Sequence, residues 1–439
     1  MKRSLSLLAV VAVALLGRAE PVASEVVVSA ADYGVGANGG GLQTKNLQTA
    51  LDAAGKLAAK ERKTVVVRLP AGRVESGSLY FNQDNVVLEL PGGSVLAGSS
   101  NWRDYGSGAG GWDCAFITAR GRRNIGLRGR GTLECNGVES PNGEQHYRGP
   151  HGISAADCTG VSVSGITIHD AGNYAFFCRN GANIRLDGVT IQAGHDGLHA
   201  QNCRGIRIAR CDFRTADDCV AGADNVDVVV ERCRFNSTCN AFRFGVKDFT
   251  VRNCVFQGPG EYPHKLFVRE GRDRRDMHAA FSHFSPPDRN PRHHSDNWLV
   301  EDCIMDRVRS LYEYNHVAGT WQNGLPAKKL VFRRVTATNL SRPLEVVGDS
   351  GRSFDLTLED VKLGLCPEEG SRSVIDLFCI HALRIRNLDL RNGGQSPLLR
   401  VRVSDLVEWT DADEQSLGGR TESGDIRKWS KVASLSAAP

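Results

Sequence analysis

The sequence predicts an all-β protein built as a parallel β-helix, a solenoid in which each turn of the chain stacks on the turn before it. Three observations predict this fold. Apolar residues alternate with polar ones from about residue 160 onwards, the alternation recurs at an interval of about 22 residues, and no helix interrupts that interval. A repeat this short excludes ankyrin-type and other helical solenoids, and it is too short for a propeller blade.

The repeat is clearest in five segments that share one pattern of apolar positions. They are VSVSGITI (161–168), IRLDGVTI (184–191), IRIARCDF (206–213), VVVERCRF (228–235) and FTVRNCVF (249–256). Their sixth residues, separated by 23, 22, 22 and 21 positions, are Ile166, Val189, Cys211, Cys233 and Cys254. Equivalent residues of neighbouring coils lie about 4.8 Å apart. We therefore expect these residues to form a ladder in the core, where a free Cys behaves as a small hydrophobic residue.

The N-terminus has the features of a secretory signal peptide over residues 1–19. Lys2 and Arg3 precede an apolar run from Leu5 to Leu16, and small residues permit cleavage after Ala19 or as late as Ala23. The run is shorter than the roughly 20 residues that a membrane span needs. We expect export to the periplasm or the extracellular space, with no membrane span. A net charge of +4 over 439 residues does not indicate nucleic-acid binding.

The rest of the chain is predicted to form one β-helix domain over residues 26–410. A helix at 42–61, with Thr44 as its N-cap, is expected to cover the open N-terminal end of the solenoid, although it could also lie elsewhere on the surface. Residues 258–296 break the period with charges, prolines and histidines and read as an inserted loop. Residues 411–439 are polar and aperiodic, typical of a tail or a C-terminal cap.

A second ladder carries acidic side chains. Seven residues beyond the core markers lie Asn173, Asp196, Asp218 and Asn240, and Asp217 adjoins Asp218. Stacked carboxyl groups repel one another, so at least one of them should have a raised pKa. A protonated acid beside ionised bases is what hydrolysis of a glycosidic bond requires. The alternative is that these Asx residues only cap turns by bonding to nearby backbone.

Candidate substrate contacts lie three positions further along the same face. These positions are Phe176, His199, Ala221, Arg243, Glu313 and Glu345. Arg243 could hold a sugar oxygen or form a salt bridge with the aspartates, and His195 could be a donor in the pocket or a turn residue. No group of His, Cys and Asp residues has the spacing of a recognised metal motif. We therefore expect neither a metal ion nor a cofactor.

Several motifs resemble glycoside hydrolase family 28, the polygalacturonase-like family of the pectin-lyase-like superfamily, and most closely a divergent bacterial branch. They include ADYGVGANGG, NVVLELPGGSVLAGS and GRGTLECNG, then GHDG (194–197) and DDC (217–219). The resemblance implies a right-handed, single-stranded β-helix that hydrolyses a pectin-type polysaccharide or oligosaccharide with inversion of the anomeric centre. It also implies that Asp217 is the general acid, and that Asp196 and Asp218 are the bases that activate water.

The chain departs from the family pattern in two places. Asn240, within CNA (239–241), stands where the family has the His of GHG, and no RIK motif follows, although Lys265 or Arg269 could replace its basic residues. Recognition of a uronate is therefore left open. A disulfide between Cys219 and Cys239 could brace the site, or both could be thiols.

Two other functions fit the same scaffold. One is a polysaccharide lyase or epimerase, and the other is a β-helix that binds glycans without catalysis. For each of these functions the partner is a glycan, and we expect the protein to be a monomer.

Overall fold

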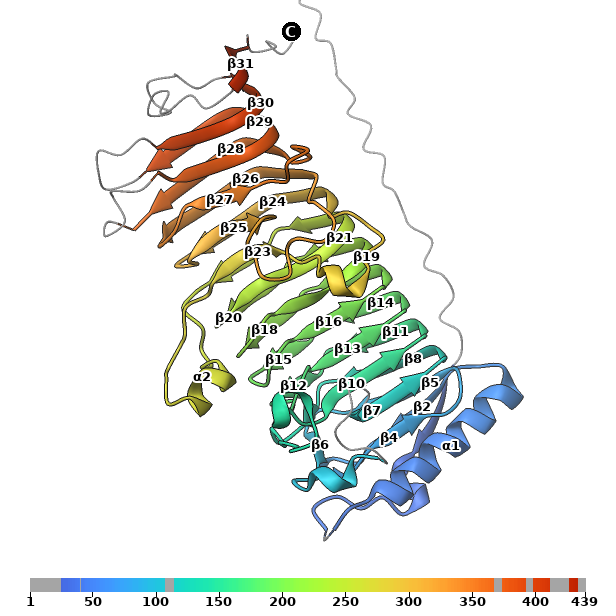
Figure 1. Ribbon diagram of the computed structural model, residues 1–439. Coiled ribbons are helices and arrows are strands. Elements are labelled where there is room, and N and C mark those ends of the chain that lie inside the picture. Colours follow the sequence, from blue (N-terminus) through green and yellow to red (C-terminus); the bar gives the residue numbers. More distant parts are fainter. Residues whose placement is uncertain are drawn as a thin grey trace, which may run out of the picture.

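The strands of the protein pair in parallel and are wound into successive coils (Figure 1). The structure is a computed structural model that describes residues 25–39, 41–106, 114–366, 373–391, 398–410 and 426–432. The all-β prediction is confirmed. The expected signal peptide lies outside the described residues. Among the helices that the described ranges contain, none has the length and apolarity to cross a membrane.

The strands fall into three stacks that run along the solenoid. The first stack begins with short strands and continues into long ones. Its members are β1 (Val26–Ser29), β2 (Val65–Arg68), β5 (Val86–Leu90), β8 (Arg123–Gly129), β11 (Thr159–Ser164), β14 (Ala182–Asp187), β17 (Arg204–Ala209), β19 (Val220–Glu231), β21 (Asn240–Arg252), β24 (Asp296–Asp306), β26 (Lys329–Leu340), β28 (Asp355–Leu365), β29 (Ile375–Arg391), β30 (Leu399–Thr410) and β31 (Ile426–Lys431). The predicted register is confirmed, since Ile184 pairs with Val161 on one side and with Ile206 on the other.

The second stack follows the first after a sharp turn in each coil. It consists of β3 (Gly72–Ser76), β6 (Ser94–Gly98), β9 (Thr132–Glu134), β12 (Thr167–His169), β15 (Thr190–Gln192), β18 (Asp212–Thr215), β20 (Arg234–Ser237) and β22 (Val255–Gln257). The turn residue has a positive φ in successive coils, as at Gly165, Gly188 and Arg210. Glycine reaches this conformation without steric cost, which explains Gly165 and Gly188 at this place in the repeat.

The third stack carries the candidate site. Its strands are β4 (Leu79–Phe81), β7 (Ala115–Arg120), β10 (His151–Ala156), β13 (Phe176–Arg179), β16 (Leu198–Gln201), β23 (Ala279–His283), β25 (Ser310–Asn315) and β27 (Leu344–Val347), together with the first residues of β19, β21, β29 and β30. The core inside the three stacks is apolar, and the ladder residues Cys211, Cys233 and Cys254 are buried in it as predicted.

The N-terminal helix α1 (Thr44–Glu61) lies at the first coils, where it contacts β1 to β5 through buried residues such as Leu47 and Leu51 (Figure 1). The expected N-cap is wrong by one position. Gln43 is the N-cap and makes no side-chain capping bond, while Thr44 begins the helix. The Thr44 hydroxyl instead accepts a hydrogen bond from the Gly77 backbone amide at 2.8 Å, which ties the helix to the end of β3.

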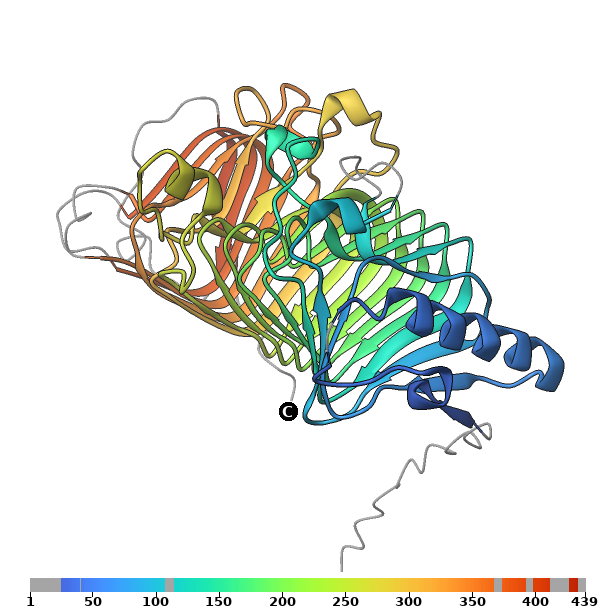
Figure 2. The same cartoon turned by 90° about the horizontal axis from the view of Figure 1, so that it is seen from below.

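The expected insertion at 258–296 is only partly an excursion from the stack. It contains α2 (Lys265–Arg269) and the 3-10 helix η4 (Pro287–Arg289), which project from the coils (Figures 1 and 2). Its residues 279–283, however, form β23, which pairs with β21 and β25 as a regular member of the third stack. Phe281 of β23 stacks on Phe242 at 5.2 Å in the core. The segment lost its repeat signal because charged loops surround a single five-residue strand.

Candidate active site

The predicted stack of acidic residues forms at the start of the third-stack strands. The Gly197 amide donates to the Asp218 carbonyl oxygen at 2.9 Å, and the Cys219 amide donates to that of Asn240 at 2.9 Å. Asp196, Asp218 and Asn240 therefore occupy one position on three successive coils. Asn173 is displaced from this position by one residue, because Phe176 pairs with Leu198 and so makes Tyr174 the counterpart of Asp196.

Asp218 is fully buried and held by two neighbours from the next coil. The Asn240 side chain donates to Asp218 Oδ1 at 2.7 Å, and the Asn240 amide donates to the same atom at 3.0 Å. Arg243 Nε lies 2.7 Å from Asp218 Oδ2. The guanidinium of Arg243 also packs against the rings of Phe284 and Trp321, at 4.9 and 5.0 Å from their centroids. Arg243 thus forms a salt bridge with Asp218, one of the two roles that the sequence allowed for it. Arg243 also lines the groove that adjoins the cluster.

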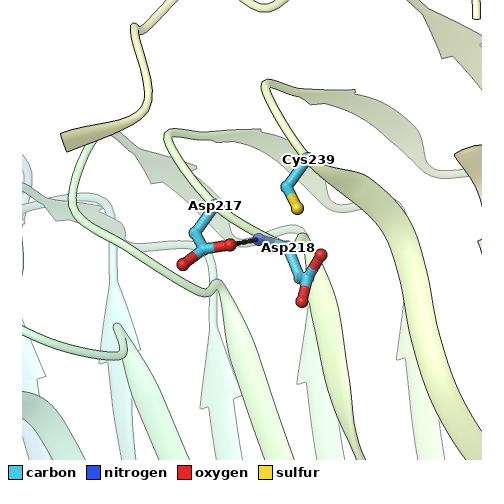
Figure 3. A group of neighbouring side chains, drawn as sticks. All are labelled: Asp217, Asp218 and Cys239. Atoms are coloured by element: carbon cyan, nitrogen blue, oxygen red, sulfur yellow. Dashed lines mark hydrogen bonds between the residues drawn. The ribbon is translucent and has the colours of Figure 1, made fainter. Parts of the chain in front are cut away.

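Asp217 adjoins this pair and is bound by residues from two distant loops. Arg148 Nη2 donates to Asp217 Oδ2 at 3.1 Å, and His264 Nε2 lies 3.7 Å from Oδ1. Its own Oδ1 also accepts from the Asp218 amide at 3.1 Å, the contact drawn in Figure 3. Asp217 is 7% exposed, whereas Asp196 is 2% and Asp218 is 0% exposed. Asp217 is therefore the carboxyl group of the three that solvent reaches most.

Asp196 lies on the coil before that of Asp217 and Asp218, and it forms a hydrogen bond with His199. His199 Nδ1 is 2.9 Å from Asp196 Oδ2, and the His199 ring stacks on Tyr174 at 4.4 Å. Burial lowers the pKa of His199 well below its ordinary value, and the positive charges of Arg289 and Arg243 add to this effect. His199 is therefore neutral, and a single hydrogen bond between Nδ1 and Oδ2 fixes the orientation of Asp196.

The three carboxyl groups differ in their affinity for a proton. Burial raises the pKa of Asp196 well above its ordinary value, and the charges of Asp217 and Asp218 raise it further. Burial also raises the pKa of Asp218, although Arg243 opposes the shift. Burial alone would raise the pKa of Asp217 too, but the contact with His264 and the charge of Arg148 outweigh it and hold that pKa well below its ordinary value. Asp217 is therefore ionised, whereas burial and the charges of the neighbouring aspartates favour a proton on Asp196.

Among the described residues, Asp217, Asp218 and Cys239 are the ones close enough to hold a metal ion, with one ligand atom of each within 4.8 Å of the others (Figure 3). The chemistry of this group does not suit a metal. The charges of Arg148 and Arg243 already offset the two carboxylates. Burial raises the pKa of the Cys239 thiol well above its ordinary value, and Asp218 adds to this, whereas a metal ligand would have to be a thiolate. We derive no step through a metal.

Of the two alternatives left open for Cys219 and Cys239, the structure has the two free thiols. The Cys219 side chain points into the core, where it contacts the Thr215 hydroxyl at 3.4 Å. Cys239 instead faces Asp217 and Asp218 on the outside of the coil (Figure 3). The Cys219 thiol thus lies in the core, whereas the Cys239 thiol lies beside the carboxyl groups.

Three of the other predicted contacts lie on the N-terminal side of the cluster. His195 is buried beside Tyr147, with ring centroids 5.8 Å apart. Lys265 and Arg269, the expected substitutes for the RIK motif, both belong to α2 and are bound by carboxylates of this chain. Lys265 Nζ lies 2.7 Å from Asp170, and Arg269 Nη1 lies 2.7 Å from Glu139. They brace the loops around the site and leave the recognition of a uronate to other residues.

On the C-terminal side of Asp218 the surface is hollowed into a groove of about 650 Å³. The predicted residues Asn240, Arg243, Glu313 and Glu345 all line it. Backbone pairing places Phe177, His199, Ala221, Arg243, Ser282, Glu313, Glu345 and Asp376 at one position on successive coils. The predicted ladder was therefore correct from His199 onwards but named Phe176 in place of Phe177, and it missed Ser282 and Asp376.

Arg148 and His264 were not identified from the sequence, although each contacts Asp217 directly. Neither belongs to a coil strand, so neither is marked by the 22-residue period. The one available signal was the position of Arg148 immediately before Gly149 and Pro150, in the loop that leads to β10. His264 was one of several histidines in the segment 258–296, and nothing in that segment distinguished it.

Comparison with known proteins supports the resemblance found in the sequence. Residues 63–238 match the family described as glycosyl hydrolases family 28. The resemblance to family 28 is confirmed. The matched region contains Asp196, Asp217 and Asp218 and ends just before Asn240, where the chain departs from the family motifs.

The related proteins are polygalacturonases. A polygalacturonase from Brassica napus is 29% identical over 113 residues, which are 22% of this chain and 28% of that protein. The chain thus matches less than a third of the length of this curated relative. The family 28 exopolygalacturonase of Yersinia enterocolitica superposes with a TM-score of 0.59 at 15% identity, over 90% of this chain and 79% of that one. A polygalacturonase from Erwinia carotovora gives 0.58 at 17% identity, over 81% and 96%. At these identities the structures establish the shared fold.

Proposed function

We propose that the protein is an exported, monomeric glycoside hydrolase with a right-handed β-helix, and that it cleaves a pectin-type or related polysaccharide or oligosaccharide. The observation that carries the proposal is the buried cluster of Asp196, Asp217 and Asp218, which lies next to a groove lined by the residues that hold Asp218, Asn240 and Arg243. Burying three carboxyl groups together is costly even with Arg148 and Arg243 beside them. The cluster also lies within the region that matches family 28.

Asp217 is proposed as the general acid that protonates the leaving oxygen. Of the three carboxyl groups it is the most exposed, so a glycosidic oxygen in the groove can reach it. In the unliganded protein Arg148 keeps it ionised. The acid form therefore becomes populated as the pH falls towards the lowered pKa of Asp217, and we expect activity to be greatest at acidic pH.

Asp196 and Asp218 are proposed to orient the attacking water, and Asp218 is proposed to take its proton, because the raised pKa of Asp196 favours the protonated form of that carboxyl group. Asp218 is the better placed, because Asn240 and Arg243 hold both of its oxygens on the edge of the groove. Inversion of the anomeric centre is proposed from the family resemblance. One oxygen of Asp217 lies within 4.8 Å of one of Asp218, and separations of about 5 Å are more typical of retaining enzymes. The anomer that is first released is therefore a decisive measurement.

The groove has the chemistry of a sugar-binding surface. It is lined by the cations Arg243, Arg274 and Arg342 and by the carboxylates Glu313, Glu345 and Asp376. Charged side chains of both signs can bind hydroxyl and carboxylate groups of a glycan. Trp321, which is 49% exposed at the same groove, offers an aromatic face on which a sugar ring can stack.

The proposal is tested by incubating the purified protein with a glycan panel that includes polygalacturonate. Reducing ends, absorbance of unsaturated products and the anomer first released are all recorded. We expect reducing ends without unsaturated product, and a loss of about 10²- to 10⁴-fold in kcat for Asp217→Asn. Asp227→Asn is the matched control, since Asp227 is an exposed carboxylate that binds Arg207 on the first stack. Unsaturated product would instead establish a lyase, and no reaction with any glycan would favour a binding protein.

A further inference from the structure

A loop whose residues Tyr147 and Arg148 are buried covers the carboxylate cluster on its N-terminal side. Residues 139–150, here called the N-terminal wall, include the 3-10 helix η3 (Glu144–His146) and lead into β10. Arg148 in this wall binds both Asp217, at 3.1 Å, and Asn173, at 3.3 Å. Tyr147 packs beside His195. Both Tyr147 and Arg148 are buried, so the wall lies directly on the cluster.

The segment that carries α2 holds this wall in place from the side. Arg269 forms two hydrogen bonds with the Glu139 carboxylate, at 2.7 and 2.8 Å, and its guanidinium lies 4.5 Å from the centroid of the Tyr147 ring. Lys265 binds Asp170 at 2.7 Å. Figure 2 shows η3 and α2 projecting from the same side of the stack. The contacts of Arg269 therefore connect the wall to α2, although Glu139 and Arg269 are 130 positions apart in the sequence, and they do so next to the proposed acid Asp217.

The groove extends from Asn240 and Arg243, which hold Asp218, toward later coils. Its lining residues Arg243, Glu313, Glu345 and Asp376 stand on successively later coils. Asp376 is four coils beyond Arg243, which at about 4.8 Å per coil corresponds to roughly 19 Å. This length accommodates several sugar residues on the C-terminal side of the proposed acid.

From this asymmetry we infer that the protein cleaves at the end of a glycan chain, and that the N-terminal wall determines this mode of action. The inference rests on the proposed function. A chain that is cut internally must pass the acid on both sides. Here the side chains of Arg148 and Tyr147 stand on one side of the acid in direct contact with Asp217 and His195. Only a chain terminus can enter beneath the wall, while the remainder of the chain lies along the groove.

The mode of action is tested with polygalacturonate and with an unlabelled galacturonate octamer, from which the short products are separated by length. We expect reducing ends to accumulate with little loss of viscosity, and one short product to be released from the octamer at all times. A mixture of product lengths with an early fall in viscosity would overturn the inference while leaving the hydrolase intact. Failure of the proposed function has a different signature, because no reducing ends would then appear on any glycan of the panel.

The role of the wall is tested by loosening its brace. The double variant Lys265→Ala/Arg269→Ala removes both ion pairs of α2 with its neighbours, and we expect the ratio of viscosity loss to reducing ends to rise about two- to fivefold. Arg272→Ala is the control, because Arg272 binds Glu270 and Phe267 within its own segment. The charge exchange Glu139→Arg/Arg269→Glu should restore the normal ratio. An unchanged ratio in a folded double variant would refute the role assigned to the wall.

Discussion

The ion pair between Arg148 and Asp217 allows a direct test of the proposed acid. Arg148→Leu removes the cation while keeping an apolar side chain of moderate size. Arg148 lies 3.1 Å from the carboxylate, and the side chains of both residues are at least 90% buried. Removing the charge leaves Asp217 with His264 beside it, at 3.7 Å. The pKa of Asp217 must then rise, because burial still disfavours its ionised form.

The magnitude of the effect follows from the burial of the pair. Deleting one partner of a buried ion pair costs about 3 to 5 kcal/mol. We expect a value near the lower limit, about 3 kcal/mol, because Asp217 can take up a proton and His264 remains beside it. Arg207→Leu is the control. Arg207 and Asp227 form an ion pair of similar length whose side chains are 45% and 54% exposed, and exposed pairs contribute only about 0 to 1 kcal/mol.

Two measurements check this prediction. Urea denaturation should show a much larger loss of the free energy of unfolding for Arg148→Leu than for Arg207→Leu at pH 7. The difference should shrink at low pH, where Asp217 is protonated and no longer needs a cation. The alkaline limb of the kcat/KM profile should move to higher pH in Arg148→Leu, because Asp217 keeps its proton longer. An alkaline limb that does not move would refute Asp217 as the acid and point to Asp196, which already has a raised pKa.

Two further predictions concern groups whose protonation changes on folding. Asp196→Asn should abolish most activity yet stabilise the protein at neutral pH. A carboxyl group whose pKa is raised in the folded state stabilises the fold only at low pH, so the gain in stability over the wild type should grow as the pH rises from about 4. A melting temperature that falls at pH 7 would contradict this. Burial lowers the pKa of His283 to about 4. Because the folded protein keeps this ring neutral, the free energy of unfolding should fall by up to about 3 kcal/mol as the pH falls from about 6.5 to 4. His283→Gln should flatten the stability curve over that interval, and an equally steep curve in denaturant titrations would exclude His283 as the cause.

The sequence alone determined the fold and the core of the candidate site, because both depend on the period. Alternating strands at 22-residue spacing placed Cys211, Cys233 and Cys254 in one core ladder. The same spacing stacked Asp196 on Asp218 and brought Asn240 and Arg243 beside them. In a solenoid, neighbours in space are residues one period apart, so contacts of this kind can be read from the sequence by counting.

Only the tertiary structure determined which loops cover the face of the solenoid that carries the carboxylates. Arg148 reaches Asp217 from 69 positions away, and Arg269 reaches Glu139 from 130 positions away, through loops that obey no repeat. The ladder of substrate contacts was also misread by one residue at Phe176, because the coil that contains it has an extra residue before the third stack. Loops leave the regular stack, so no spacing predicts where they fold back. The carboxylates were therefore predictable, whereas the cations that set their protonation and the wall that closes the groove were not.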